Sequence, residues 1–298
     1  MGKAIIFGAN GQDGFYLTSL LKNAKIDTLS ISRKVGDILG DVRDLSFVEN
    51  IIRKEKPDFI FNFAAKSTAS HDFIYENHDT ISTGCLNILE SVRKYSLASK
   101  IFISGSALQF ENIGNPIDES TNFKATSSYA VSRIHSTYLS RYYREKFGMK
   151  IYIGYLFNHD SPLRNSNHFN KKVILEINEI LSNNKSHINL GNLNIKKEFG
   201  FAGDIVEAIW VLVNQNKHFE AVIGTGKVFS LKEWVKKCFS KFDLDWEKFV
   251  IHDENDNIEY SVLQSNPNLI MNMGWSPKVD FNQLVDLMVD IQTIRDAV

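Results

Sequence analysis

The chain has 298 residues, which is enough for one large domain or for a large domain and a small one. Its 34 Lys and Arg residues nearly balance its 35 Asp and Glu residues, so no excess of positive charge indicates nucleic acid or an anionic membrane as a partner. The two cysteines and eight histidines have no metal-ligand spacing, and the N-terminal apolar run is too short for a signal peptide or a membrane span. We therefore expect a cytoplasmic protein with no metal, in which any anionic ligand needs a local basic site.

Short apolar runs alternate with amphipathic stretches through the first half of the chain. The apolar runs predict strands at residues 4–7, 28–32, 58–63, 100–104 and 150–157. The intervening stretches predict helices at residues 14–23, 47–54, 81–95 and 129–147. Strands that alternate with helices pair in parallel through right-handed crossovers. The predicted fold class is therefore α/β, with a Rossmann-type doubly wound parallel sheet.

The alternation becomes less regular after residue 157. Helices are predicted at residues 173–181, 205–213, 231–239 and 281–294, and a late strand at 221–223. We interpret residues 1–157 as a Rossmann domain, to which the segment 198–225 returns. Residues 158–197 and 226–298 then form a smaller C-terminal lobe for the substrate.

The first predicted strand runs directly into a glycine-rich turn. Glycines spaced three and three residues apart let backbone N–H groups and a helix N-terminus approach a pyrophosphate. Because the turn follows the first strand of an alternating chain, it predicts a dinucleotide site. The residues of this site are Gly8, Asn10, Gly11, Gln12, Asp13 and Gly14.

The end of the second strand indicates which dinucleotide binds. Arg33 stands where an acid would bind the ribose hydroxyls of NAD, and a basic residue there suits the 2′-phosphate of NADP. The alternative to a phosphate site is that Arg33 and Lys34 are simply two charged side chains in solvent. Asp41 and Val42 follow at a position where a carboxylate can meet the adenine amino group. We expect NADP as the cofactor, with NAD as the alternative.

Six segments resemble GDP-mannose 4,6-dehydratases, and together they cover nearly the whole chain. They are GANGQDGFYL at 8–17, GDVRD at 40–44, NFAAKS at 62–67, LFNHDSP at 156–162, LGNL at 190–193 and KKEFGFAGD at 196–204. The resemblance implies the extended short-chain dehydrogenase/reductase fold, NADP, and conversion of GDP-mannose to a 4-keto-6-deoxy sugar nucleotide. It also implies cofactor contacts from Phe63, Ala64, Ala65, Tyr129, Arg133 and Leu156.

The implied reaction sets clear chemical requirements. A tyrosinate takes the proton of sugar O4 while hydride leaves C4, and the resulting ketone acidifies the C5–H bond. A carboxylate then removes the C5 proton, water leaves C6, and hydride returns to C6. The reaction therefore needs a Tyr, a nearby cation, a hydroxyl at O4 and a carboxylate base.

Most of the catalytic positions implied by the resemblance are changed in this chain. Tyr129 matches the catalytic Tyr, but Arg133, one helical turn further, stands where the family has Lys. Arg keeps the positive charge that favours tyrosinate but is bulkier and planar. The family's hydroxyl, carboxylate and helix Asn positions fall on Gly105, Ala107 and Ile81. We assign catalysis to Tyr129, Arg133 and a hydroxyl from Ser104 or Ser106.

Three interpretations follow from these changes. The first keeps hydride chemistry at C4 without efficient dehydration, as in a 4-reductase, 4-oxidase or 4-epimerase. The second is a dehydratase with a relocated base, for which Glu111 is the nearest acid in sequence. The third is a non-catalytic paralogue that binds cofactor or nucleotide. The dehydratase remains the best single family label.

The expected partner is a nucleotide-sugar, and the expected assembly is a homodimer. We assign substrate binding to Asn158, His159, Arg164, Lys172 and Lys197. The family's Arg-Pro-x-Glu ribose motif is not recognisable near residues 259–262, so GDP is implied by resemblance while UDP and CDP stay open. The long basic loop that helps build the family's tetramer is missing between Arg33 and Gly40, which favours a dimer through two Rossmann-domain helices.

Overall fold

The computed structural model describes residues 2–253 and 260–290. Its largest sheet has seven parallel strands, and the expected doubly wound fold is confirmed. From one edge to the other, the strands are β3 (Ile38–Leu39), β2 (Asp27–Ser32), β1 (Lys3–Phe7), β4 (Phe59–Asn62), β5 (Lys100–Ser106), β6 (Lys150–Leu156) and β11 (Glu220–Ile223). The late strand therefore returns to the first sheet, where it pairs with β6.

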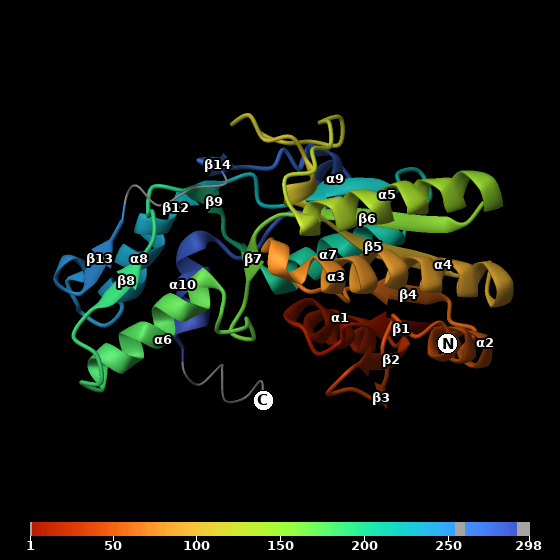
Figure 1. The fold of residues 1–298 in the computed structure, drawn as a ribbon, viewed down its shortest axis with the longest axis horizontal. Helices are drawn as coiled ribbons and strands as arrows, with labels where there is room; N and C mark the ends of the chain where they lie inside the picture. Colours follow the sequence, from red (N-terminus) through yellow and green to blue (C-terminus); the bar gives the residue numbers. More distant parts are fainter. Residues whose placement is uncertain (1, 254–259, 291–298) are drawn as a thin grey trace.

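Helices cover both faces of this sheet (Figure 1). Alternate strand residues point to opposite faces, so Ile6 packs on one side and Ile5 on the other. One face is covered by α1 (Gln12–Asn23), α7 (Ala202–Val213) and α9 (Asn268–Asn272). The other face is covered by α2 (Leu45–Glu55), α4 (Gly84–Tyr95) and α5 (Ser128–Phe147). Of the helices in the described ranges, none is long and apolar enough to cross a membrane.

A smaller lobe lies beside the carboxyl ends of the central strands (Figure 1). Its core stacks Phe199 on Trp234, with ring centroids 5.1 Å apart, inside a cluster of buried apolar side chains. Its helices are α6 (Phe169–Leu181), α8 (Leu231–Ser240) and α10 (Phe281–Val289). Its strands are β8 (Ile188–Leu190), β9 (Lys196–Glu198), β12 (Val228–Ser230), β13 (Val250–His252) and β14 (Val262–Leu263). The closing helix was predicted to reach residue 294, but positions after 290 lie outside the described residues.

Short segments connect the two parts and position the site. β7 (His159–Asp160) follows β6 and pairs with β10 (Gly200–Phe201), which precedes α7. α3 (Ile74–Asn77) and a π-helical turn, η2 (His78–Thr83), lead into α4. The hydroxyl of Ser127 accepts a hydrogen bond from the backbone N–H of Ala130, so α5 begins immediately before Tyr129.

Candidate active site

The glycine turn forms one wall of a cavity of about 210 Å³ at the N-terminus of α1. Gly8 has φ of +79°, and a Cβ there would lie 2.7 Å from the backbone N of Ala64. A Cβ on Gly14 would lie 2.5 Å from Cα of Ala9. Only glycine fits these approaches, which leave room for a pyrophosphate against the helix N-terminus. The predicted residues that line this cavity are Gly8, Asn10, Gly11, Gln12, Asp13, Gly14, Arg33, Asp41, Val42, Phe63, Ala64 and Ala65.

Charged residues at the adenosine end of this cavity have defined partners. Asp41 accepts hydrogen bonds from Arg43 Nε at 2.9 Å and Nη2 at 2.6 Å. Burial raises the pKa of the Asp41 carboxyl, but the hydrogen bonds and charge of Arg43 outweigh it, so the pKa is lowered. Arg33 is exposed at the cavity edge, where a phosphate can reach it. The sequence reasoning did not identify Thr80, which also lines this cavity.

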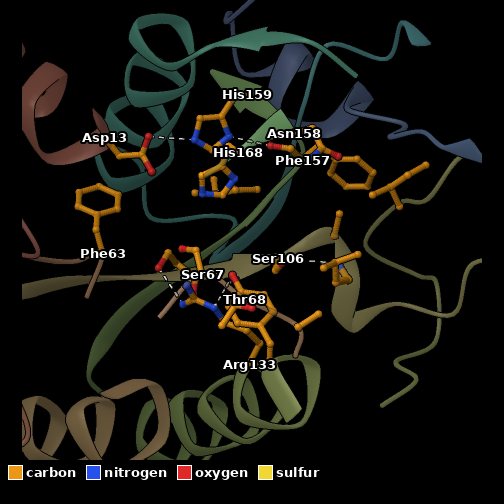
Figure 2. A pocket seen from close by; sticks show the side chains of 18 of the residues that line it. Asp13, Phe63, Ser67, Thr68, Ser106, Arg133, Phe157, Asn158, His159 and His168 are labelled. Atoms are coloured by element: carbon orange, nitrogen blue, oxygen red, sulfur yellow. Dashed lines mark hydrogen bonds and ion pairs between the residues drawn. The ribbon is translucent and has the colours of Figure 1, made fainter. Parts of the chain in front are cut away.

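A second cavity of about 270 Å³ contains the predicted catalytic residues (Figure 2). Arg133 Nε donates to the Tyr129 hydroxyl at 3.2 Å, and its guanidinium lies 5.2 Å from the centre of the Tyr129 ring. Arg133 Nη1 also donates to the backbone oxygen and, at 2.9 Å, to the hydroxyl of Ser104. The planar donor set of Arg thus holds the Tyr hydroxyl and strand β5 together. The positive charge of Arg133 therefore lies beside the Tyr129 hydroxyl, where it favours the phenolate form.

The two predicted serines have different roles in the structure. Ser104 donates to the backbone oxygen of Asn62 at 3.0 Å and accepts from Arg133, so its hydroxyl is fully engaged. Ser106 accepts from the backbone N–H of Leu108 at 3.2 Å, which leaves its own proton to donate into the cavity. Ser106 is therefore the better partner for a sugar hydroxyl.

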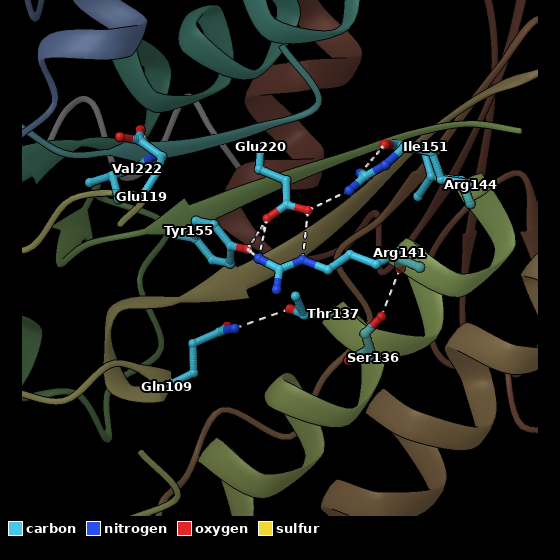
Figure 3. Close-up of polar contacts among 11 residues, drawn as sticks. Gln109, Glu119, Ser136, Thr137, Arg141, Arg144, Ile151, Tyr155, Glu220 and Val222 are labelled. Carbon is cyan, nitrogen blue, oxygen red and sulfur yellow. Dashed lines mark hydrogen bonds and ion pairs between the residues drawn. The ribbon is translucent and has the colours of Figure 1, made fainter. Parts of the chain in front are cut away.

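Neighbouring side chains occupy the space beside Gly105. A Cβ on Gly105 would lie 2.7 Å from Cδ1 of Tyr155 and 3.1 Å from Oε1 of Gln109. The Tyr155 hydroxyl donates to Glu220 at 2.5 Å, and Glu220 also accepts from Arg141 (Figure 3). Gln109 is buried and donates to Thr137 at 3.0 Å. A residue with a side chain at position 105 would therefore need Tyr155 or Gln109 to move.

An ion pair joins the glycine turn to the loop after β6. His159 Nε2 lies 2.9 Å from Asp13 Oδ1, and Nδ1 lies 2.7 Å from the backbone oxygen of Phe157. Both neighbours are acceptors, so both ring nitrogens carry protons and the pair is imidazolium with carboxylate. Burial opposes both charges, but the mutual interaction outweighs it: the pKa of Asp13 is lowered and that of His159 is raised. Asp13 is the only carboxylate among the described residues that line the catalytic cavity.

Two further polar groups face the cavity. Arg164 Nη2 lies 3.0 Å from Nδ1 of His168, and Arg164 lines both cavities. Burial and the charge of Arg164 lower the pKa of His168 to about 4. His168 is therefore neutral near pH 7, with Nδ1 as acceptor and Nε2 as donor. No local pattern marks His168, because its position depends on Arg164 and on the start of α6.

The structure does not bring every predicted substrate residue into the site. Asn158, His159 and Arg164 line the catalytic cavity, as does Leu156. Lys172 is exposed on α6 and lines a separate surface hollow, because the helix turns it away from the cavity. Lys197 lies outside both sets of lining residues, and its amine lies 5.4 Å from the Phe199 ring centre. Burial lowers the pKa of that amine.

The candidate base and the position of the family's helix Asn both lie outside the cavity lining. Glu111 forms an ion pair with Lys124 at 3.2 Å and does not line the catalytic cavity. Ile81 is buried within the π-helical turn. Asn77, one turn earlier, donates to the hydroxyl of Ser128 at 3.3 Å and so contacts the first residue of the Tyr129 helix.

Fold and site define a Rossmann-type protein of the extended short-chain dehydrogenase/reductase class. Solved structures with this fold include the NADPH complex of RMD from Pseudomonas aeruginosa, at a TM-score of 0.87 and 14% identity over 100% of both chains. Another is the NAD complex of Thermus thermophilus UDP-glucose 4-epimerase, at a TM-score of 0.83 and 20% identity over 99% of this chain and 100% of that one.

Sequence comparison gives the particular family. Residues 5–288 match the profile described as GDP-mannose 4,6 dehydratase. The GDP-mannose 4,6 dehydratase of Dictyostelium discoideum is 31% identical over an alignment 345 positions long, which covers 99% of this chain and 97% of the relative. The chain belongs to the GDP-mannose 4,6-dehydratase family, and the resemblance noted in the sequence is confirmed.

Proposed function

We propose that this protein is an NADP-dependent enzyme that transfers hydride at C4 of a nucleotide-linked sugar. The observation that carries the proposal is the contact of Arg133 with the Tyr129 hydroxyl inside a cavity that adjoins the glycine turn. Family membership supports a nucleotide-sugar substrate, with GDP as the first nucleotide to test. The cofactors of the two solved structures support a nicotinamide dinucleotide, and Arg33 favours the 2′-phosphate form.

The residues of the cavity support proton transfer at sugar O4. A bound nicotinamide accepts or supplies the hydride. Tyr129 takes the O4 proton when the alcohol is oxidised and returns it when the ketone is reduced. Arg133 stabilises the phenolate by charge and by its Nε–H hydrogen bond, and Ser106 orients O4.

Dehydration needs one more group, a base for the C5 proton. Position 107 is alanine, and the Asp13 carboxylate is held by His159. We therefore place C4 oxidation or reduction before dehydration, although family membership keeps dehydration as the second candidate.

Assembly and location are part of the same proposal. Val131, Tyr138 and Tyr142 are each more than half exposed on one face of α5. That face suits a homodimer in which two copies pack their Rossmann-domain helices together. Both cysteines are free and buried, which is consistent with a reducing cytoplasm.

The experiment is isotope transfer from NADPH deuterated at the reactive C4 position. The 4-keto forms of GDP- and UDP-linked sugars are incubated with this NADPH, their 4-hydroxy forms are incubated with NADP in deuterated water, and the products are analysed by proton NMR and mass spectrometry. We expect deuterium at sugar C4, which Tyr129→Phe abolishes while NADPH still binds. Absence of transfer to every sugar despite bound NADPH would show a binding paralogue. A new C6 methyl with solvent deuterium at C5 would show dehydration instead.

A further inference from the structure

One wall of the catalytic cavity is apolar and rigid. Ala107, Leu108, Phe157 and Leu263 line the cavity and belong to one hydrophobic cluster, which we call the apolar wall. These residues come from three separate places: the turn after β5, the end of β6, and β14.

Strand β14 is fixed over the ends of β5 and β6 by polar contacts outside the cavity. The side chain of Asn112 donates to the backbone oxygen of Val262 at 2.7 Å. The backbone N–H of Ser265 donates to the buried carboxylate of Glu198 at 2.6 Å. Leu263 therefore has little freedom to move away and admit water.

Polar groups gather on another side of the cavity. Asn158, Arg164 and His168 line the cavity, and the guanidinium of Arg164 bonds His168. A diphosphate needs such donors, whereas the apolar wall offers none. The diphosphate end of the substrate is therefore expected at the polar side, with C4 at Tyr129.

The chemistry of a hexopyranose then decides what lies against the apolar wall. C1 carries the diphosphate and C4 is opposite to it, so two edges of the ring remain. The C2–C3 edge carries two hydroxyls in a hexose, and burial of either against carbon would cost a hydrogen bond. The C5–C6 edge carries a hydroxymethyl in an ordinary hexose but only a methyl in a 6-deoxy sugar. The apolar wall fits that methyl.

We propose that the substrate is a 4-keto-6-deoxy nucleotide-sugar, which this protein reduces at C4. This inference rests on the proposed function and adds the state of C6. C4 accepts hydride from the reduced nicotinamide, the carbonyl π electrons move to O4, and O4 takes the proton of Tyr129, which solvent then restores. A 4,6-dehydration is the class of reaction that must supply this ketone, so the missing C5 base is not needed here.

The test compares sugars that differ only at C6. GDP-mannose and UDP-glucose are each assayed beside their 6-deoxy counterparts, with NADP and formation of NADPH as the readout. We expect kcat/KM to be about 10- to 100-fold higher for a 6-deoxy sugar, the usual range for an apolar pocket that discriminates one hydroxyl. Equal rates, or a preference for the 6-hydroxy sugar, would overturn this inference and leave the proposed function intact. No hydride transfer from any sugar to NADP would instead overturn the proposed function.

A pair of variants tests the wall itself. Ala107→Ser adds one hydroxyl to the wall with little change in volume, and the 6-deoxy preference should fall about 10-fold. Ala98→Ser makes the same change at an exposed residue that does not line the cavity, and the preference should stay as in the parent. An unchanged preference in Ala107→Ser would remove residue 107 from substrate recognition and refute the wall as argued. Near-ultraviolet circular dichroism checks that both variants are folded.

Discussion

Substitution of Gly105 by Thr would introduce the hydroxyl residue that the sequence resemblance implies at this position, and we expect it to destabilise the protein. The new Cβ alone would lie 2.7 Å from Tyr155 Cδ1, and the two further heavy atoms need space in the same region. Tyr155 cannot retreat easily, because its hydroxyl bonds Glu220 at 2.5 Å and its ring packs 4.9 Å from that of Phe110. Overpacking of this kind costs about 3 kcal/mol, and loss of glycine freedom in the unfolded chain returns about 1 kcal/mol.

We therefore expect Gly105→Thr to lower the free energy of unfolding by about 2 kcal/mol, which lowers Tm by about 4 °C for a chain of this size. Urea unfolding followed by circular dichroism measures the free energy of unfolding. Tyr155→Leu removes the ring and should reduce the cost of Gly105→Thr to below about 1 kcal/mol in a double-mutant cycle. Tyr155→Phe keeps the ring but removes its bond to Glu220, so the cost should fall by less than it does in Tyr155→Leu. If Gly105→Thr is as stable as the parent, or if its cost does not depend on the Tyr155 ring, the packing argument is wrong.

Three further predictions concern charge and assembly. Arg33→Ala should weaken NADP binding about 10- to 100-fold, the value of a charge-assisted hydrogen bond, and an equal loss for NAD in calorimetry would refute the 2′-phosphate assignment. Although burial opposes it, hydrogen bonds from Arg141, Tyr155 and Arg144 lower the pKa of Glu220 to about 2 from an ordinary 4.5. The ionised Glu220 carboxylate therefore stabilises the folded protein above about pH 4.5, and this stabilisation is lost as pH falls toward 2. Glu220→Gln should lower the free energy of unfolding by about 3 kcal/mol at pH 7 and make it depend less on pH between 4.5 and 2. An equally steep acid-side loss in that variant would refute the assignment. Tyr138→Glu combined with Tyr142→Glu should convert the proposed dimer to a monomer in light scattering, and a persistent dimer would place the interface elsewhere.

The local parts of the site could be predicted from the sequence. The glycine turn was recognised from its position directly after the first strand, and the contact of Tyr129 with Arg133 follows from their spacing of one helical turn. Strand and helix periodicity also gave the order of elements, because burial on two faces of a parallel sheet leaves a clear pattern.

The rest depends on contacts between distant segments. Asp13 and His159 are 146 residues apart, and no local pattern shows that they meet. The filling of the space beside Gly105 likewise requires Tyr155 to arrive from β6. Lys172 shows the opposite problem, since charge and proximity to the substrate loop suggested a contact that the phase of α6 directs elsewhere.

The ion pair of Asp13 and His159 has a consequence for the order and strength of ligand binding. Gln12 reinforces the pair, because it donates to the backbone oxygen of His159 at 3.2 Å and accepts from Ser161 at 2.9 Å. The turn proposed to bind the dinucleotide and the loop proposed to bind the sugar nucleotide therefore form a single hydrogen-bonded unit. If bound dinucleotide orders this unit and so raises the affinity for the sugar by some factor, bound sugar must raise the affinity for the dinucleotide by the same factor, because thermodynamic linkage is reciprocal. The change in either dissociation constant on binding of the other ligand therefore measures the same coupling free energy.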